Sequence, residues 1–183
     1  PYFIDLEALK DEGLLDDEEL ESAQISEGYT DYGALYETRF NVLRLAYARF
    51  NIKTPDFVRF MQEGRFEDYA VFMSLKSRYG GTFDNFPDAY KFKEHLAIEE
   101  FRQSVYKSEY CFWQFLQYVF FKQWKKLKAY VNSLGIKIIG DIPLYVAYDS
   151  SDVWGHPSLF KLDENLKPTA VAGVPPDYFS QKG

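Results

Sequence analysis

The sequence predicts an α/β protein that is mostly helical, and three observations lead to that prediction. In the first two thirds of the chain, apolar residues recur at helical spacing, and residues typical of helix starts and ends separate the runs. From about residue 108 to 134, apolar residues recur every three or four positions, as on one face of a long helix. Gly135 then ends that helix, and the apolar run IKIIGDIPLYVA over residues 136–147 has the composition of a buried strand. A helix, a glycine stop and a buried strand form half of a βαβ unit.

Local signals place the earlier helices. The stretch DYGALYETRFNVLRLAYARFN over residues 31–51 has its apolar residues near helical spacing. Thr54 and Pro55 suit the N-cap and the first position of the next helix. Gly80 and Gly81 predict the end of the helix that follows.

Strands are scarce, and this limits the possible architectures. The candidates are residues 1–6 (PYFIDL), 137–146 (KIIGDIPLYV) and 169–174 (TAVAGV). A parallel strand that is buried on both faces needs parallel neighbours, and a closed eightfold barrel needs about 250 residues. We therefore expect either a small open sheet or a barrel completed by sequence outside these 183 residues. The chain also begins with Pro1 rather than Met, as would a piece of a longer protein.

Composition excludes some partners and favours others. The net charge of −7 disfavours nucleic acid, and four lysines between residues 122 and 128 fit the solvated face of a helix. No apolar run is long enough to span a membrane. Aromatic residues form 19% of the chain, which suits a large core and also sugar ligands. The single Cys111 fits a core residue in a reducing compartment, so we expect a cytoplasmic protein.

No motif indicates a cofactor or a metal. His95 and His156 have no second ligand at zinc spacing. Residues 149–152 (DSSD) lack the glycine and glutamate of a calcium loop, so we expect a turn or a helix cap there. No glycine-rich phosphate loop is present.

Three features carry candidate chemistry. Asp141 directly follows Gly140 at the end of the apolar KIIG. A carboxylate at the C-terminal end of a barrel strand faces the active site, but Asp141 fits a simple turn equally well. Trp154 is either a core residue or a stacking surface, the core being the commoner case. Residues 175–179 (PPDYF) combine a stiff Pro-Pro pair with an acid and two aromatic rings; on residues alone, they predict a capping turn.

The block IGDIPLYVAYDSSDVWGHPSLFKLDENLKPTAVAGVPPDYFSQKG resembles the amylomaltase family, also called 4-α-glucanotransferases or disproportionating enzymes. The opening PYFIDLEAL and the stretch DYGALY are similar to the same family. The likeness spans the chain, and the order of GDIP, DSSDVW and AVAGVPPDYFS is its most specific part.

The resemblance implies part of a (β/α)8 TIM barrel with a large helical insertion, related to the α-amylases. Members run to roughly twice this length or more, well beyond a bare barrel. Residues 1–107 would hold the helical insertion and the start of the barrel. Residues 108–183 would hold a helix–strand unit of the barrel and the start of an active-site loop.

The resemblance also assigns roles. Asp141 matches the acid of the first conserved α-amylase-type region, residues 175–179 match the start of a loop over the glucan cleft, and Tyr32 and Tyr36 match a surface glucan site. The nucleophilic Asp, the acid/base Glu and a third Asp of the family would lie beyond Gly183, so no catalytic residue is expected in this chain. The residues expected to bind glucan are Asp141, Asp177, Tyr178, Phe179, Tyr32, Tyr36 and Trp154.

The implied reaction is transfer of α-1,4-glucan segments to an acceptor sugar by a retaining double displacement, which uses two carboxyl groups about 5–5.5 Å apart. No cofactor is implied, and the partners are an α-1,4-glucan and the remainder of the parent chain. An α-glucan hydrolase of the same clan, a non-catalytic carbohydrate-binding module and a helical scaffold without a ligand stay open as alternatives.

Overall fold

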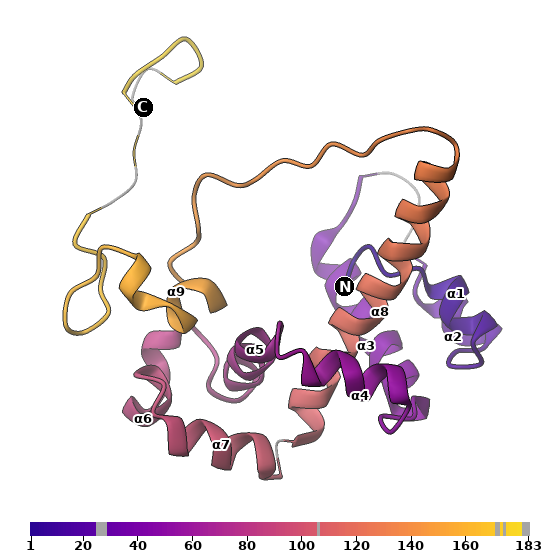
Figure 1. The fold of residues 1–183 in the computed structure, drawn as a ribbon, viewed down its shortest axis with the longest axis horizontal. Helices are drawn as coiled ribbons and strands as arrows, with labels where there is room; N and C mark the ends of the chain where they lie inside the picture. Colours follow the sequence, from indigo (N-terminus) through magenta and orange to yellow (C-terminus); the bar gives the residue numbers. More distant parts are fainter. Residues whose placement is uncertain (25–28, 106, 171–172, 174, 181–183) are drawn as a thin grey trace.

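The computed structural model describes residues 1–24, 29–105, 107–170, 173 and 175–180, and within them the regular structure is helical (Figure 1). The α-helices are α1 (Leu6–Asp11), α2 (Asp17–Ser22), α3 (Tyr32–Arg49), α4 (Pro55–Gln62), α5 (Glu67–Tyr79), α6 (Asp88–Lys91), α7 (His95–Gln103), α8 (Lys107–Ser133) and α9 (Ser151–Gly155). Two short 3-10 helices are η1 (Phe83–Asn85) and η2 (Pro157–Leu159).

Capping residues, prolines and glycines mark where these helices begin and end. The Asp31 carboxylate accepts hydrogen bonds from the amides of Gly33 and Ala34 and so caps α3. Pro55 is the first residue of α4, as predicted, although the Thr54 hydroxyl makes no capping hydrogen bond. Gly80 ends α5 with a φ of 66°, a conformation that favours glycine.

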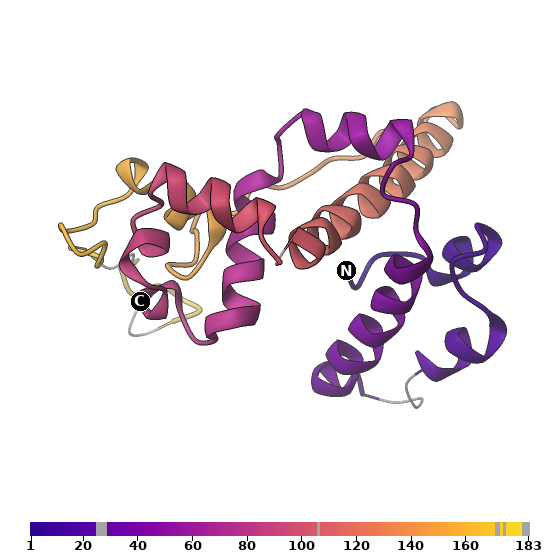
Figure 2. The ribbon, with the colours of Figure 1, turned by 90° about the horizontal axis from the view of Figure 1, so that it is seen from below.

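Helix α8 is the axis of the fold. It packs against α3, α4, α5 and α7, and it runs between α1–α3 on one side and α5–α7 on the other (Figure 2). Its N-terminal half is buried all round, from Tyr110 to Leu116, which explains why every position there is large or apolar rather than alternating. Aromatic rings fill the neighbouring space; Phe115, for example, lies 4.8 Å from Phe50 between ring centroids.

One hydrophobic core runs through the described residues, from Ile4 in the N-terminal segment to Trp154 in α9. It is continuous across residue 107, the expected boundary between the helical insertion and the helix–strand unit of the barrel. The core therefore joins the N-terminal half of α8 to the helices that precede it.

The predicted strands are absent from the described residues. The only β-type pairing there is an isolated antiparallel bridge between Leu162 and Pro168. Residues 136–147 follow α8 as an exposed extended segment that reaches α9 with no ribbon beside it (Figure 1). The physical reason is that a strand exists only through hydrogen bonds to a neighbouring strand, and no described residue supplies one.

Of the other two candidate strands, one is a turn and the other is only partly described. Residues 1–6 form a turn that enters α1, and Arg39 of α3 holds it by donating to the carbonyls of Tyr2 (3.1 Å) and Ile4 (2.5 Å). The third candidate, residues 169–174, lies partly outside the described residues.

Candidate functional site

The loop at residues 175–180 is organised by its own aspartate. The Asp177 carboxylate accepts hydrogen bonds from the amides of Phe179 (2.9 Å) and Ser180 (2.8 Å), and the Asp177 amide donates to the Ser180 carbonyl. This turn leaves the rings of Tyr178 and Phe179 96% and 92% exposed. The loop projects away from the helices (Figure 1), so both rings are free to meet a ligand or another part of a longer chain.

Asp141 lies in the exposed segment between α8 and α9. Its carboxylate accepts a hydrogen bond from the next amide, that of Ile142, at 2.9 Å. The side chain is otherwise exposed to solvent, so in this structure Asp141 bonds only within its own turn and is accessible to a partner of the segment.

Trp154 is a core residue in this structure. Its side chain is 1% exposed, its indole N–H donates to the Tyr90 carbonyl at 2.9 Å, and its ring lies 5.8 Å from that of Phe72. A ring enclosed in this way offers no face to a sugar. The geometry therefore favours the core interpretation of Trp154 over glucan stacking.

Tyr32 and Tyr36 lie in the first two turns of α3, on one face of the helix, and are 73% and 51% exposed. The start of α3 and the loop at residues 175–180 are well separated in both views (Figures 1 and 2). The residues predicted to bind glucan thus lie on separate elements and do not form one pocket in this structure.

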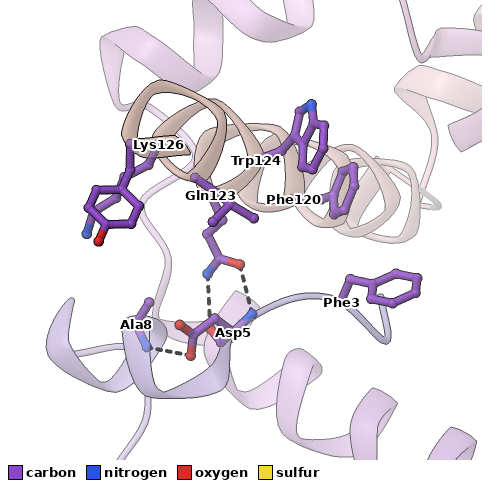
Figure 3. Close-up of a pocket in the computed structure, with 9 residues that line it drawn as sticks. Phe3, Asp5, Ala8, Phe120, Gln123, Trp124 and Lys126 are labelled. Atoms are coloured by element: carbon purple, nitrogen blue, oxygen red, sulfur yellow. Dashed lines mark hydrogen bonds between the residues drawn. The ribbon is translucent and has the colours of Figure 1, made fainter. Parts of the chain in front are cut away.

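An apolar groove of about 680 Å3 lies between residues 3–8 and the C-terminal half of α8 (Figure 3). Gln123 joins its two walls, because its side-chain oxygen accepts from the Asp5 amide (2.8 Å) and its nitrogen donates to the Asp5 carbonyl (3.0 Å). The lining residues are Phe3, Asp5, Ala8, Phe120, Gln123, Trp124, Lys126, Leu127 and Tyr130. The residues predicted to bind glucan do not line this groove.

Sequence reasoning missed a polar centre around Asp84 in η1. The Asp84 carboxylate accepts from the Tyr148 hydroxyl at 3.0 Å and pairs with Lys167 at 2.8 Å, and Lys91 lies 3.7 Å away. Next to it, the Asp149 carboxylate accepts from the Phe83 amide at 3.1 Å and pairs with Lys76. Tyr148 and Lys167 are distant from Asp84 along the chain, so no local spacing could reveal the centre.

Residues 149–152, where the sequence predicts a turn or a helix cap, lie next to this centre. Ser150 caps α9, since its hydroxyl accepts from the Val153 amide at 3.3 Å, which agrees with the predicted helix cap. The described part of the chain has no group of three or more His, Cys, Asp or Glu side chains placed to hold a metal ion. Within the same residues, none of the helices has the length and apolar character needed to cross a bilayer.

The Asp84 centre predicts a pH dependence. Burial acts to raise the pKa of Asp84, but the hydrogen bonds from Lys167 and Tyr148 and the charges of Lys167 and Lys91 outweigh it and hold this pKa below its usual value. The resulting stabilisation is present above the unfolded pKa of about 3.9 and is lost as the pH falls through the lower folded value. We expect the difference in melting temperature between the wild type and Asp84→Asn to shrink below about pH 4. A difference that stays constant from neutral pH to pH 3 would contradict the prediction.

Comparison with known proteins adds the family. The whole chain, residues 1–183, matches the family described as 4-alpha-glucanotransferase. It is 40% identical to a 4-alpha-glucanotransferase of Clostridium butyricum and 42% identical to one of Thermus thermophilus, in each case over 100% of this chain. Among solved structures it resembles the amylomaltase of Streptococcus agalactiae in complex with acarbose, with a TM-score of 0.84 and 38% identity over 98% of this chain.

The helical arrangement described above is therefore one that a solved amylomaltase shares, and the chain belongs to the 4-alpha-glucanotransferase family. It spans 39% and 37% of the lengths of the two curated relatives and 38% of the solved chain.

Proposed function

We propose that this chain is part of a 4-α-glucanotransferase, which moves α-1,4-glucan segments from a donor to the 4-hydroxyl of an acceptor sugar. The observation that carries the proposal is the match of all 183 residues to the 4-alpha-glucanotransferase family. The solved relative that holds acarbose, an oligosaccharide analogue, supports an α-glucan as the substrate class. Below, the longer protein that contains residues 1–183 is called the full-length protein.

The proposed mechanism is a retaining double displacement. One carboxylate attacks the sugar and a second carboxyl group, about 5–5.5 Å away, protonates the leaving oxygen. We assign neither group to residues 1–183. The part of this chain is to bind and to exclude water: Asp141 would accept hydrogen bonds from sugar hydroxyls or orient a catalytic neighbour, and the loop at residues 175–180 would lie over the glucan.

We further propose that the uncovered apolar surfaces of this chain pack in the full-length protein against strands of a (β/α)8 barrel. The apolar stripe continues past the buried half of α8 to Leu127 and Tyr130, and to Leu134 just after the helix ends; these side chains are 51%, 62% and 58% exposed. The groove in Figure 3 belongs to the same surface. Fully burying an exposed side chain of this size is worth about 1.5–3 kcal/mol, so covering each of these half-exposed side chains gains roughly half of that. Pairing residues 136–147 would satisfy their backbone groups. Both gains favour a strand partner.

Incubating the full-length protein with maltotriose tests the function. Transfer turns two maltotriose molecules into glucose and maltopentaose without a net gain of reducing ends. Hydrolysis instead yields one new reducing end for each bond cleaved, and a binding module yields no product. Residues 1–183 alone serve as the control and are expected to form no product. Reducing ends that increase with time, without longer oligosaccharides, would overturn the proposal in favour of a hydrolase.

The exposed rings of the loop should govern the partition between transfer and hydrolysis. Stacking of one ring on a sugar is worth on the order of 1 kcal/mol, by analogy with aromatic pairs. Replacing Tyr178 or Phe179 by Ala in the full-length protein should therefore raise the acceptor concentration required several-fold and raise the share of hydrolysis. The measurement is the ratio of glucose released by transfer to new reducing ends, on one maltooligosaccharide at fixed concentration.

Asp177→Ala is the comparison variant, because Asp177 binds backbone amides of the loop and should alter that ratio less. If rate, ratio and stability are unchanged in both aromatic variants, the loop is an ordinary capping turn.

A further inference from the structure

Asp84 connects two segments that are far apart in the sequence. It lies in η1, after α5, and its side chain is 18% exposed. One carboxylate oxygen accepts from the Tyr148 hydroxyl, and the other lies 2.8 Å from the Lys167 ammonium. Each oxygen therefore holds a different segment.

The first of these segments carries Asp141. Residues 136–147 are exposed, and Tyr148 is where the chain returns to the core. The Tyr148 ring packs 4.9 Å from that of Phe83, next to Asp84. Asp149 strengthens the anchor by accepting from the Phe83 amide and pairing with Lys76 of α5. The segment that carries Asp141 is thus fastened at one end by α8 and at the other by this contact.

The second segment leads toward the loop at residues 175–180. Lys167 belongs to a tight turn in which the Asp163 carboxylate accepts from the amides of Asn165 and Lys167, both at 2.8 Å. The Thr169 amide closes the turn by donating to the Lys161 carbonyl at 2.9 Å. Because these hydrogen bonds hold Lys167 and Thr169 in one turn, the Lys167–Asp84 pair sets the position from which the chain continues beyond Thr169.

We propose that Asp84 is a positioning residue for glucan transfer, which holds the segment carrying Asp141 and the segment leading to the loop at one point of the helical region. This inference rests on the function proposed above. Asp84 acts through Tyr148 and Lys167 and touches no substrate.

The protonation state of Tyr148 and the charges around Asp84 stabilise these contacts at neutral pH. Burial, then the hydrogen bond to Asp84 and the charge of Asp84, raise the pKa of Tyr148. Its hydroxyl therefore keeps its proton and remains a donor at neutral pH. Lys167 supplies positive charge at the other carboxylate oxygen of Asp84, and Lys91 lies 3.7 Å from the oxygen that accepts from Tyr148. An amide at position 84 would keep an acceptor but lose the attraction to both lysines.

Three variants of the full-length protein separate the two connections: Asp84→Asn weakens both, Tyr148→Phe removes the first and Lys167→Met removes the second. We expect Asp84→Asn to lower kcat and to raise the hydrolysis share, each by about 3- to 30-fold, which is below the roughly 100-fold loss that an ångström of misplacement can cause. Tyr148→Phe should mainly lower kcat, and Lys167→Met should mainly raise the acceptor KM and the hydrolysis share.

Glu19→Gln is the matched control. Glu19 pairs with Arg49, and the side-chain exposures of that pair, 14% and 43%, are close to the 18% and 51% of Asp84 and Lys167. It lies in α2, on neither segment. We expect this variant to change stability as Asp84→Asn does, with kcat, KM and the hydrolysis share per folded molecule unchanged.

Backbone hydrogen exchange measures the fastening without using activity. Exchange in residues 161–169 should accelerate in Asp84→Asn and Lys167→Met, and exchange in residues 148–150 should accelerate in Asp84→Asn and Tyr148→Phe. Unchanged exchange overturns the inference. Faster exchange with kinetics equal to those of Glu19→Gln reduces Asp84 to a structural role and overturns it too. If exchange accelerates in the variants as expected but the wild type transfers no glucan, the proposed function is refuted, and with it the positioning role. The contacts of Asp84 with Tyr148 and Lys167 would still stand as structural contacts.

Discussion

Replacing Asp141 by asparagine in the full-length protein should slow glucan transfer roughly 30- to 1000-fold, the equivalent of about 2–4 kcal/mol in the activation free energy. Asparagine has the shape of aspartate and retains an oxygen that can accept from the Ile142 amide, so the local turn survives. What it loses is the negative charge that would bind sugar hydroxyls or orient a catalytic neighbour. The measurements are kcat and KM on maltotriose, together with the melting temperature, which should move little.

Asp141→Ala provides the second comparison, because it removes the turn hydrogen bond as well as the charge. If Asp141 acts through its charge, the two variants should have similar rates and differ mainly in stability. Normal activity per folded molecule in both variants, with a loss of stability in Asp141→Ala, would identify Asp141 as a turn residue and remove it from the site.

Trp154→Ala should destabilise the protein by about 3–5 kcal/mol, as expected when a large aromatic side chain is deleted from a close-packed core. The indole is buried against Phe72, and its N–H is bonded to the Tyr90 carbonyl. Its loss leaves a cavity where α9 meets α5. Urea unfolding would measure the effect as a lower transition midpoint.

Trp154→Phe should be milder, since it keeps most of the apolar contact and loses about 1 kcal/mol for the hydrogen bond plus the missing volume. Tyr178→Ala is the opposite control, because that ring is 96% exposed and its removal should leave the unfolding midpoint unchanged. If Trp154→Ala instead left stability intact and weakened glucan binding, the alternative role of Trp154 as a stacking surface would be restored.

The helices were the part of the fold that sequence spacing could predict. The helix predicted over residues 108–134 is α8 at Lys107–Ser133, and the signals at Pro55 and Gly80 mark a real start and a real end. These features depend on hydrogen bonds and side chains within a few residues of one another, so local sequence contains them. The strand over residues 136–147 was predicted from composition, but composition cannot supply the neighbouring strand on which it depends.

In the candidate site, too, the sequence predicted local features but not which distant residues meet. The aspartate-bonded turn at Asp177 and the shared helix face of Tyr32 and Tyr36 follow from spacing within a few residues. Family resemblance assigned the glucan roles, and it spans the whole chain.

By itself, the sequence determined the helices, their ends, the local turn at Asp177 and the membership of the 4-alpha-glucanotransferase family. Only the tertiary structure decided that Trp154 is enclosed in the core and that the apolar stripe of α8 is buried at one end and uncovered at the other. It also decided that Asp84 joins Tyr148 to Lys167. The physical reason is that burial and long-range pairing depend on which distant residues the folded chain brings together, and neither periodicity nor residue type specifies those partners.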